Sequence, residues 1–279
     1  MTSIPILTPN RRWRSVAVTG SKGGVGKSNL TVNLALSLQR AGRRVVLVDG
    51  DLGLANIDVL LGLTPPRTVE HLVRGEADVD ELLVDGPGGI RILPAASGVP
   101  RLTRMDPDTR RRVLEALTRS EALADHVLVD TGAGLNETAL ALQLSASRVI
   151  VVTTSEPTSL VDAYASIKVL WDAEPSKPID LVVNNVNSAQ EADSAYGQIA
   201  TACRHFLQHE PGWLGSVCSD PKIPGAVRQQ RALLDLYPTS PAARCYERIA
   251  LKLAAQSESV PGYGFWEELA SNTLEETYH

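Results

Sequence analysis

The chain has 279 residues, of which 43% are hydrophobic, and it carries a formal net charge of -5. A chain of this size can bury a sizeable core, and no Pro/Gly/Ser-rich linker divides it, so we expect a single folded domain. Its acidic balance provides no overall positive field for nucleic acid, which disfavours a protein that coats DNA. A local basic patch stays compatible with this composition.

The N-terminus and the cysteines further narrow the class of protein. The N-terminus has no apolar signal core, and no stretch has the length needed to span a bilayer, which predicts a cytoplasmic protein. Cys203, Cys218 and Cys245 lie far apart and form no C-x-x-C pair, so neither a zinc site nor an iron-sulfur scaffold is indicated. We expect these cysteines to pack in apolar surroundings.

The stretch 20–28, with the sequence GSKGGVGKS, predicts a loop between a strand and a helix. It follows the apolar run 16–18 and precedes an amphipathic run that continues to about Arg40. Glycine removes the Cβ atoms that would keep a phosphate from the backbone, and N–H groups at a helix N-terminus attract anions. A nucleoside triphosphate with Mg²⁺ is therefore the predicted ligand. The predicted nucleotide contacts are Gly23, Gly24, Val25, Gly26, Lys27, Ser28 and Asn29, with Lys27 on the phosphate oxygens and Ser28 on Mg²⁺.

Nearly all-apolar runs of strand length predict the fold class. They cover residues 44–49, 126–130, 149–153 and 179–183, with shorter candidates at 90–94 and 214–217. Such runs are typical of strands that helices cover on both faces, so we predict an α/β, three-layer P-loop NTPase fold with a mostly parallel twisted sheet. Helices are expected at 106–119, 157–171, 226–236 and 240–255. The first has a basic face, which we interpret as a solvated surface.

Three carboxylates follow two of these strands, at the sheet edge where such folds bind ligands. Asp49 and Asp51 end the second strand, where one carboxylate can hold Mg²⁺ through water and the other can orient the attacking water. The alternative is that both cap the helix that begins near Ile57. Asp130 ends the strand 126–130 before a glycine-rich turn, and we predict that it is the Walker-B ligand of the metal.

The far end of the site is expected near the strand 179–183. Asn184 follows that strand, and its side-chain amide could bind the adenine edge. A turn-forming pair with Asn185 explains the same residues nearly as well.

The loop also contains Lys22, and Ser21 replaces the usual first glycine. The motif Lys-Gly-Gly-x-Gly-Lys-Ser resembles that of the deviant P-loop ATPases of the ParA/MinD group. The stretches 51–58, 156–164, 226–231 and 237–244 resemble one branch of it, the flagellar-number regulators of the FlhG/FleN type. The resemblance implies an ATPase that forms ADP and phosphate, with Lys22 reaching the partner's phosphates, Asp51 positioning water, Asp49 as its upstream partner, and the loop of Asp220 flanking the base.

A dimerising switch of flagellar number or placement at the cell pole follows from this resemblance. Its expected assembly is a homodimer with ATP, and candidate partners are a flagellar GTPase or a flagellar transcription or assembly protein. Nucleic acid is not an expected partner, and peripheral contact at the inner membrane stays open. The alternatives are a chromosome- or plasmid-partitioning ATPase and a septum-site ATPase. An iron-sulfur carrier of the same fold would need cysteine spacing that is missing here.

The resemblance predicts an ATPase domain over residues 15–256 between a flexible tail, 1–14, and a C-terminal tail, 257–279. The first tail has no Asp-Gln-Ala core of the kind with which members of this branch activate a GTPase. In the second, Phe265, Trp266 and Leu269 lie beside acidic residues. Anionic lipid headgroups would repel such a segment, so we expect a poor membrane-binding helix.

Overall fold

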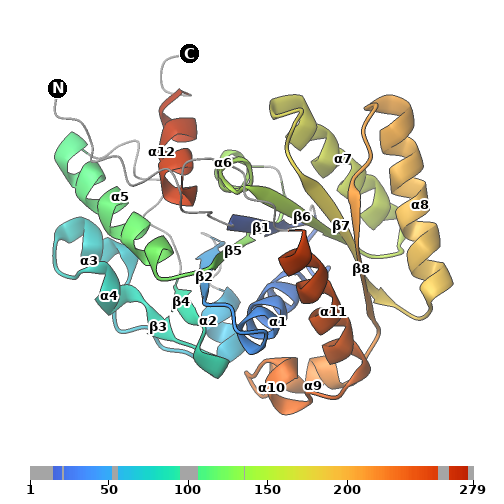
Figure 1. Ribbon diagram of the computed structural model, residues 1–279, viewed down its shortest axis with the longest axis horizontal. Helices are drawn as coiled ribbons and strands as arrows, with labels where there is room; N and C mark the ends of the chain where they lie inside the picture. The colour runs from blue at the N-terminus through green and yellow to red at the C-terminus, as the bar shows by residue number, and fades with distance from the viewer. Residues whose placement is uncertain are drawn as a thin grey trace.

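The computed structural model describes residues 15–20, 22–51, 56–94, 106–134, 136–256 and 264–275. The predicted N-terminal tail lies outside these ranges. The described strands form one sheet in the order β3-β4-β2-β5-β1-β6-β7-β8 (Figure 1). Their bounds are β1 Ser15–Thr19, β2 Val45–Gly50, β3 Val84–Asp85, β4 Arg91–Leu93, β5 His126–Thr131, β6 Arg148–Thr153, β7 Ile179–Val186 and β8 Gly212–Cys218.

The sheet is parallel except at one edge, where β3 pairs with β4 in the antiparallel sense. Every residue of β1, β2 and β5 is buried. This explains the continuous apolar runs, because helices cover both faces of a parallel sheet and neither face meets water. The predicted fold class is confirmed.

Helices form the two outer layers (Figure 1). The helices that contribute to the core under one face are α3 Val69–Arg74, α4 Val79–Leu82, α5 Pro107–Ala122, α6 Glu137–Ser145, α7 Pro157–Ala173, α8 Ala189–Phe206 and α12 Phe265–Glu275. Those under the other face are α1 Lys27–Arg40, α2 Asn56–Leu61, α9 Lys222–Arg228, α10 Leu233–Leu236 and α11 Pro241–Ala255. A short 3₁₀ turn, η1, covers Pro87–Gly89.

The helix starts follow local chemistry. Asp106, Asn136, Ser188 and Ser240 are N-caps whose side chains accept a hydrogen bond from the backbone N–H three residues later. Proline occupies the first turn of α5, α7 and α11, where its missing N–H costs nothing. These short-range signals explain why most predicted helices begin within a residue or two of the observed ones.

The predicted helix 226–236 is wrong. The structure divides this stretch into the end of α9 and the short helix α10. Gln230 between them has φ 53, in the left-handed region, and the Arg231 N–H donates to Ala226 O in a closing turn. A residue with this φ ends a right-handed helix, so the amphipathic pattern spans two helices instead of one.

Helix α12 is the part of the predicted C-terminal tail that the structure describes, and it packs onto the rest of the chain. Helix α12 lies against α5 and α6 (Figure 1), and Phe265, Trp266 and Leu269 are at most 1% exposed. The apolar side of this helix therefore belongs to the core of the described molecule, and its first acidic residues, Glu267 and Glu268, are partly exposed. Over the described residues, no helix combines the length and apolar character that crossing a membrane requires.

Candidate functional site

The loop between β1 and α1 has the geometry of a phosphate cradle. Gly24 and Gly26 have φ 84 and φ 92, which favour glycine. A Cβ on Gly26 would lie 2.2 Å from Asn184 Nδ2, whereas a Cβ on Gly23 or Gly24 would meet nothing within 4 Å. The backbone of Gly23 and Gly24 therefore faces open space, while Gly26 lets β7 approach the loop.

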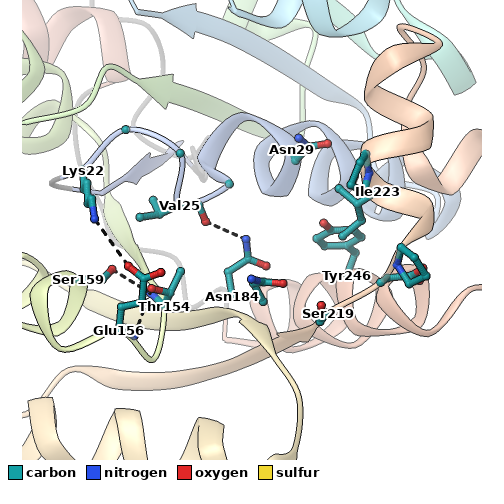
Figure 2. Close-up of a pocket in the computed structure, with 17 residues that line it drawn as sticks. Lys22, Val25, Asn29, Thr154, Glu156, Ser159, Asn184, Ser219, Ile223 and Tyr246 are labelled. Carbon is teal, nitrogen blue, oxygen red and sulfur yellow. Dashed lines mark hydrogen bonds and ion pairs between the residues drawn. The ribbon is translucent and has the colours of Figure 1, made fainter.

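A pocket of about 530 Å³ adjoins this loop (Figure 2). Its lining combines the loop with the segments that follow β6, β7 and β8, at the edge where the carboxyl ends of the strands meet. The lining residues are Lys22, Gly23, Gly24, Val25, Gly26, Asn29, Thr154, Glu156, Ser159, Asn184, Asn185, Ser219, Asp220, Pro221, Ile223, Pro224 and Tyr246. Open α/β sheets bind ligands in this position.

Lys27, the first residue of α1, is a buried cation. The residue is only 9% exposed, and Nζ donates to Lys22 O at 3.5 Å, so the side chain is directed at the loop. Burial lowers the pKa of Lys27, and the negative charges of Asp130 and Asp51 act against that shift. A cation held at this point can neutralise a phosphate group in the cradle.

Asp130 is buried at the end of β5, directly behind the start of α1. Its carboxylate accepts hydrogen bonds from Ser28 and, at 3.2 Å, from Thr31 Oγ1. Burial raises the pKa of Asp130 to about 6, although these hydrogen bonds and Lys27 lower it. The structure thus brings together Ser28 and Asp130, two of the three residues that sequence reasoning assigned to the metal, the third being Asp49.

Asp49 is also fully buried, and the structure gives it a capping role. Oδ1 accepts from the Asp51 N–H at 3.1 Å, and Oδ2 accepts from the N–H groups of Asn56 and Ile57 at 3.1 and 3.2 Å. Burial raises the pKa of Asp49 to about 7. Asp49 therefore caps the start of α2, as the alternative interpretation expected. A contact between Asp49 and Mg²⁺ through water stays a prediction.

Asp51 lies beside the glycine-rich turn after β5 and contacts the side chain of Asn56, the first residue of α2. Its Oδ2 accepts from Asn56 Nδ2 at 2.8 Å, and a Cβ on Gly132 would lie 3.3 Å from Oδ1. The carboxylate is partly exposed and close enough to Lys27 to influence its pKa. A carboxylate in this position can accept a hydrogen bond from a water molecule near the cradle.

Asn184 and Asp220 both line the pocket, Asn184 directly beside the loop. Asn184 Nδ2 donates to Val25 O at 2.8 Å, which leaves Oδ1 as an acceptor for an exocyclic amino group (Figure 2). β7 continues through Asn184 to Val186, past the predicted strand end. Both carboxylate oxygens of Asp220 are bonded to backbone N–H groups of Lys222 and Ala242, so Asp220 holds the wall in place.

Lys22, at the mouth of the pocket, is half exposed and pairs with Glu156. The distance from Nζ to Oε2 is 3.6 Å (Figure 2). Glu156 is the N-cap residue of α7, in a loop that Ser159 fixes by accepting from the Thr154 N–H and contacting Thr153 Oγ1. The lysine therefore remains accessible from outside, beside the cradle of its own chain.

Sequence reasoning missed several residues of the site. Thr31, Ile223 and Tyr246 carry no motif, because their roles depend on contacts between distant segments. Glu156 did have a signal, since it opens one of the stretches that resemble the flagellar branch. Its charge opposite Lys22 appears only in the folded chain.

These residues fit a nucleotide with Mg²⁺. The cradle exposes backbone where a Cβ would meet no atom, a buried ammonium group lies beside it, and a serine hydroxyl and a carboxylate meet behind it. Mg²⁺ is usually held by one or two such oxygen ligands together with phosphate oxygens.

Comparisons with known proteins agree with this geometry. Residues 16–233 match the CobQ/CobB/MinD/ParA nucleotide binding domain family. The antiactivator FleN of Pseudomonas aeruginosa is 39% identical over 238 residues, 85% of each chain. The flagellum site-determining protein YlxH of Helicobacter pylori is 30% identical over 245 residues, 88% of this chain and 83% of the relative. The septum site-determining protein MinD of Pyrococcus horikoshii, solved with Mg-ADP, superposes with a TM-score of 0.68 at 24% identity, covering 88% of this chain and 99% of MinD.

Proposed function

Because this chain belongs to the CobQ/CobB/MinD/ParA nucleotide-binding family, we propose that it is an ATP-dependent dimerising switch that regulates the number or placement of flagella. It is a Mg²⁺-dependent ATPase of the ParA/MinD type, with ATP and ADP as its nucleotides. YlxH, at 30% identity, is named as a flagellum site-determining protein, and the antiactivator FleN, at 39% identity, has the name of the flagellar-number branch that the sequence resembles. Both favour this function over DNA partitioning.

The mechanism follows from where the side chains lie. Lys27 and the backbone N–H groups from Gly23 to Ser28 hold the triphosphate, while Ser28 and Asp130 are the proposed magnesium ligands. When bound, Mg²⁺ neutralises charge on the β- and γ-phosphate oxygens. Asp51 orients the attacking water at the edge of the cradle, and Asp49 fixes the backbone on both sides of the loop that carries Asp51.

The base is proposed to lie between the loop and the wall formed after β8. Asn184 Oδ1 accepts from the adenine amino group, and Asn29, Ile223 and Pro224 lie around it. Asp220 keeps the wall in place through its backbone contacts. This arrangement discriminates against a guanine base, which presents a carbonyl oxygen to the same acceptor.

The observation that carries the switch is the position of Lys22. It lies at the mouth of the pocket, half exposed, where a second subunit facing the first could receive its charge on the γ-phosphate. A contact made only in the two-fold dimer with ATP would shift the population towards that dimer, and ADP would not. Glu156 holds the lysine at this mouth until then.

Lys22→Ala tests the switch. The variant should bind ATP through Lys27 and the cradle, remain monomeric with ATP, and lose on the order of 10³-fold in hydrolysis, by analogy with arginine fingers. Light scattering at several protein concentrations measures the dimer, and phosphate release measures turnover. Lys168→Ala, which alters an exposed lysine on α7, is the matched control. A Lys22→Ala dimer as tight as the wild type would refute trans-activation.

The flagellar role needs a separate test in a flagellated cell. Replacing the chromosomal copy by one encoding Lys22→Ala should change the number or position of flagella seen by electron microscopy, whereas Lys168→Ala should not. Unchanged flagella together with defective plasmid or chromosome partitioning would favour the partitioning alternative. A flagellar GTPase or a flagellar transcription or assembly protein is the proposed partner, to be identified by binding to the ATP-bound dimer.

A further inference from the structure

Two cysteines far apart in the sequence meet at the end of β8. Cys218 is the last residue of that strand, Cys245 lies in the second turn of α11, and their sulfur atoms are 3.8 Å apart. The sequence spacing indicated no such pair. Cys203 belongs to the core on the opposite face of the sheet, so it does not take part.

The surroundings of the two thiols differ. Cys218 is partly exposed, whereas Cys245 is buried. A guanidinium nitrogen of Arg248 lies 3.2 Å from Cys245 Sγ and supplies a positive charge beside that sulfur. One thiol is therefore open to a small reagent, and the other lies beside it, within reach of the sulfur atom that the reagent would oxidise.

The pair is joined by sequence to the base end of the pocket. Ser219 and Asp220 follow Cys218 directly, Tyr246 follows Cys245, and all three line the pocket (Figure 2). The segment between the cysteines contains α9 and α10, and with them Ile223 and Pro224 of the wall. A covalent link between Cys218 and Cys245 would close this wall into a loop.

We propose that Cys218 and Cys245 form a dithiol site that a hydroperoxide oxidises to an intramolecular disulfide, and that this bond restrains the base-side wall of the pocket. The effect on the nucleotide depends on the function proposed above, whereas formation of the disulfide does not. The sulfurs must approach from 3.8 Å to about 2.05 Å, a change that side-chain rotation at one or both cysteines can supply.

The chemistry balances with one molecule of hydrogen peroxide as the hydroperoxide. The Cys218 thiolate attacks a peroxide oxygen, breaks the O–O bond and becomes a sulfenic acid, releasing one water after protonation. The Cys245 thiolate then attacks the Cys218 sulfur and displaces hydroxide, which takes up a proton as the second water. Two thiols lose two electrons and two protons in total, and the peroxide is reduced to two waters.

Burial also limits how fast the pair reacts. It raises the pKa of Cys218 to about 11, so little of the reactive thiolate is present near neutral pH. The site should therefore respond to sustained exposure to a peroxide. A thiol reductant restores the two thiols by exchange through a mixed disulfide.

Hydrogen peroxide treatment of the full chain tests the proposal. Titratable thiols should fall from three to one, and peptide mapping without reductant should find Cys218 joined to Cys245 within one chain and Cys203 free. Release of a fluorescent ADP analogue should become slower and recover after reduction. Cys218→Ser should abolish the cross-link and the effect on release, whereas Cys203→Ala should keep both.

The possible outcomes test the dithiol site and its effect on the pocket separately. Three free thiols after oxidation, or only intermolecular disulfides, would overturn the dithiol site. A Cys218–Cys245 disulfide with unchanged release of the analogue would overturn the link to the pocket. Failure of the reduced wild-type protein to bind any adenine nucleotide would contradict the proposed function and the link to the pocket, while the mapped disulfide would still support the dithiol site.

Discussion

At the scale of single residues, the site works by placing opposite charges in a buried space. Lys27 and Asp130 are both buried. Burial lowers the pKa of Lys27 and raises that of Asp130, and both shifts favour the neutral form of the side chain. Each opposes the shift of the other, because an adjacent opposite charge favours the charged form. The pair is thus prepared for a ligand that brings its own negative charge and a metal ion.

Lys27→Ala should abolish measurable ATP binding. The lysine is expected to make charge-assisted hydrogen bonds worth about 3 kcal/mol in total, so its loss should weaken affinity by at least about 100-fold. Isothermal titration calorimetry measures the change, with Lys168→Ala as the control for loss of a lysine. Unchanged affinity in Lys27→Ala would show that the phosphates bind elsewhere.

Asp51→Ala should retain ATP binding and lose most of the hydrolysis. The substitution removes the carboxylate proposed to orient water and leaves the cradle intact, so the ATP-bound dimer should accumulate. Phosphate release measures turnover, and light scattering measures the dimer. Asp193→Ala, at an exposed position on α8, is the control. Wild-type turnover in Asp51→Ala would remove Asp51 from the mechanism.

At the scale of elements, a buried acid on α5 makes the packing of α12 depend on pH. Glu121 near the end of α5 is 1% exposed, and its Oε1 accepts from the Trp266 N–H at 2.8 Å. Its Oε2 finds no hydrogen-bond partner among the described residues. Burial raises the pKa of Glu121 to about 8, with Glu267 adding to the shift. The folded chain therefore favours the protonated acid.

This pKa shift predicts how stability depends on pH. Between about pH 4.5 and 8 the folded state binds more protons at Glu121 than the unfolded state, so the free energy of unfolding falls as pH rises through this window. The loss is a few kcal/mol at most. Glu121→Gln should remove this dependence and raise stability at pH 8 more than at pH 5.

Urea unfolding at both pH values measures the effect. Glu115→Gln alters an exposed residue on the same helix and should leave the pH dependence as in the wild type. A Glu121→Gln variant with the same loss of stability between pH 5 and pH 8 would show that Glu121 is already ionised in the folded chain.

At the scale of the whole molecule, the distribution of charge predicts weak binding to DNA. The net charge is -5, and arginines of α5 are already engaged within the chain. Arg111 pairs with Asp108, Arg119 pairs with Asp78, and Arg112 donates to Val73 O. These contacts support the interpretation of this helix as a solvated face.

In the presence of ATP and at physiological salt, we therefore expect the protein not to bind non-specific duplex DNA in a gel-shift assay. Binding through several phosphate contacts would instead make the affinity depend steeply on salt. The logarithm of the binding constant would fall with the logarithm of the salt concentration, with a slope of about -0.9 per contact. A salt series with ATP and with ADP provides the measurement. Tight, ATP-dependent and salt-sensitive binding would favour the partitioning alternative.

Local patterns in the sequence determined the fold class, the position of the phosphate-binding loop between β1 and α1, and the position of Asp130 near the end of a buried strand, β5. The reason is that a glycine-rich loop, a buried strand and the residue that ends it are each specified by neighbours within a few positions. The single helix predicted at 226–236 failed because the left-handed φ of Gln230, which has no glycine to signal it, ends α9 early.

Only the tertiary structure decided what the distant segments do to one another. Asp49 caps α2, Glu156 holds Lys22, α12 completes the core under one face, and Cys218 meets Cys245. No periodicity encodes these contacts, because they depend on the order in which the strands enter the sheet and on the helices packed between them. Residues that meet from remote positions therefore acquired their roles only in the folded chain.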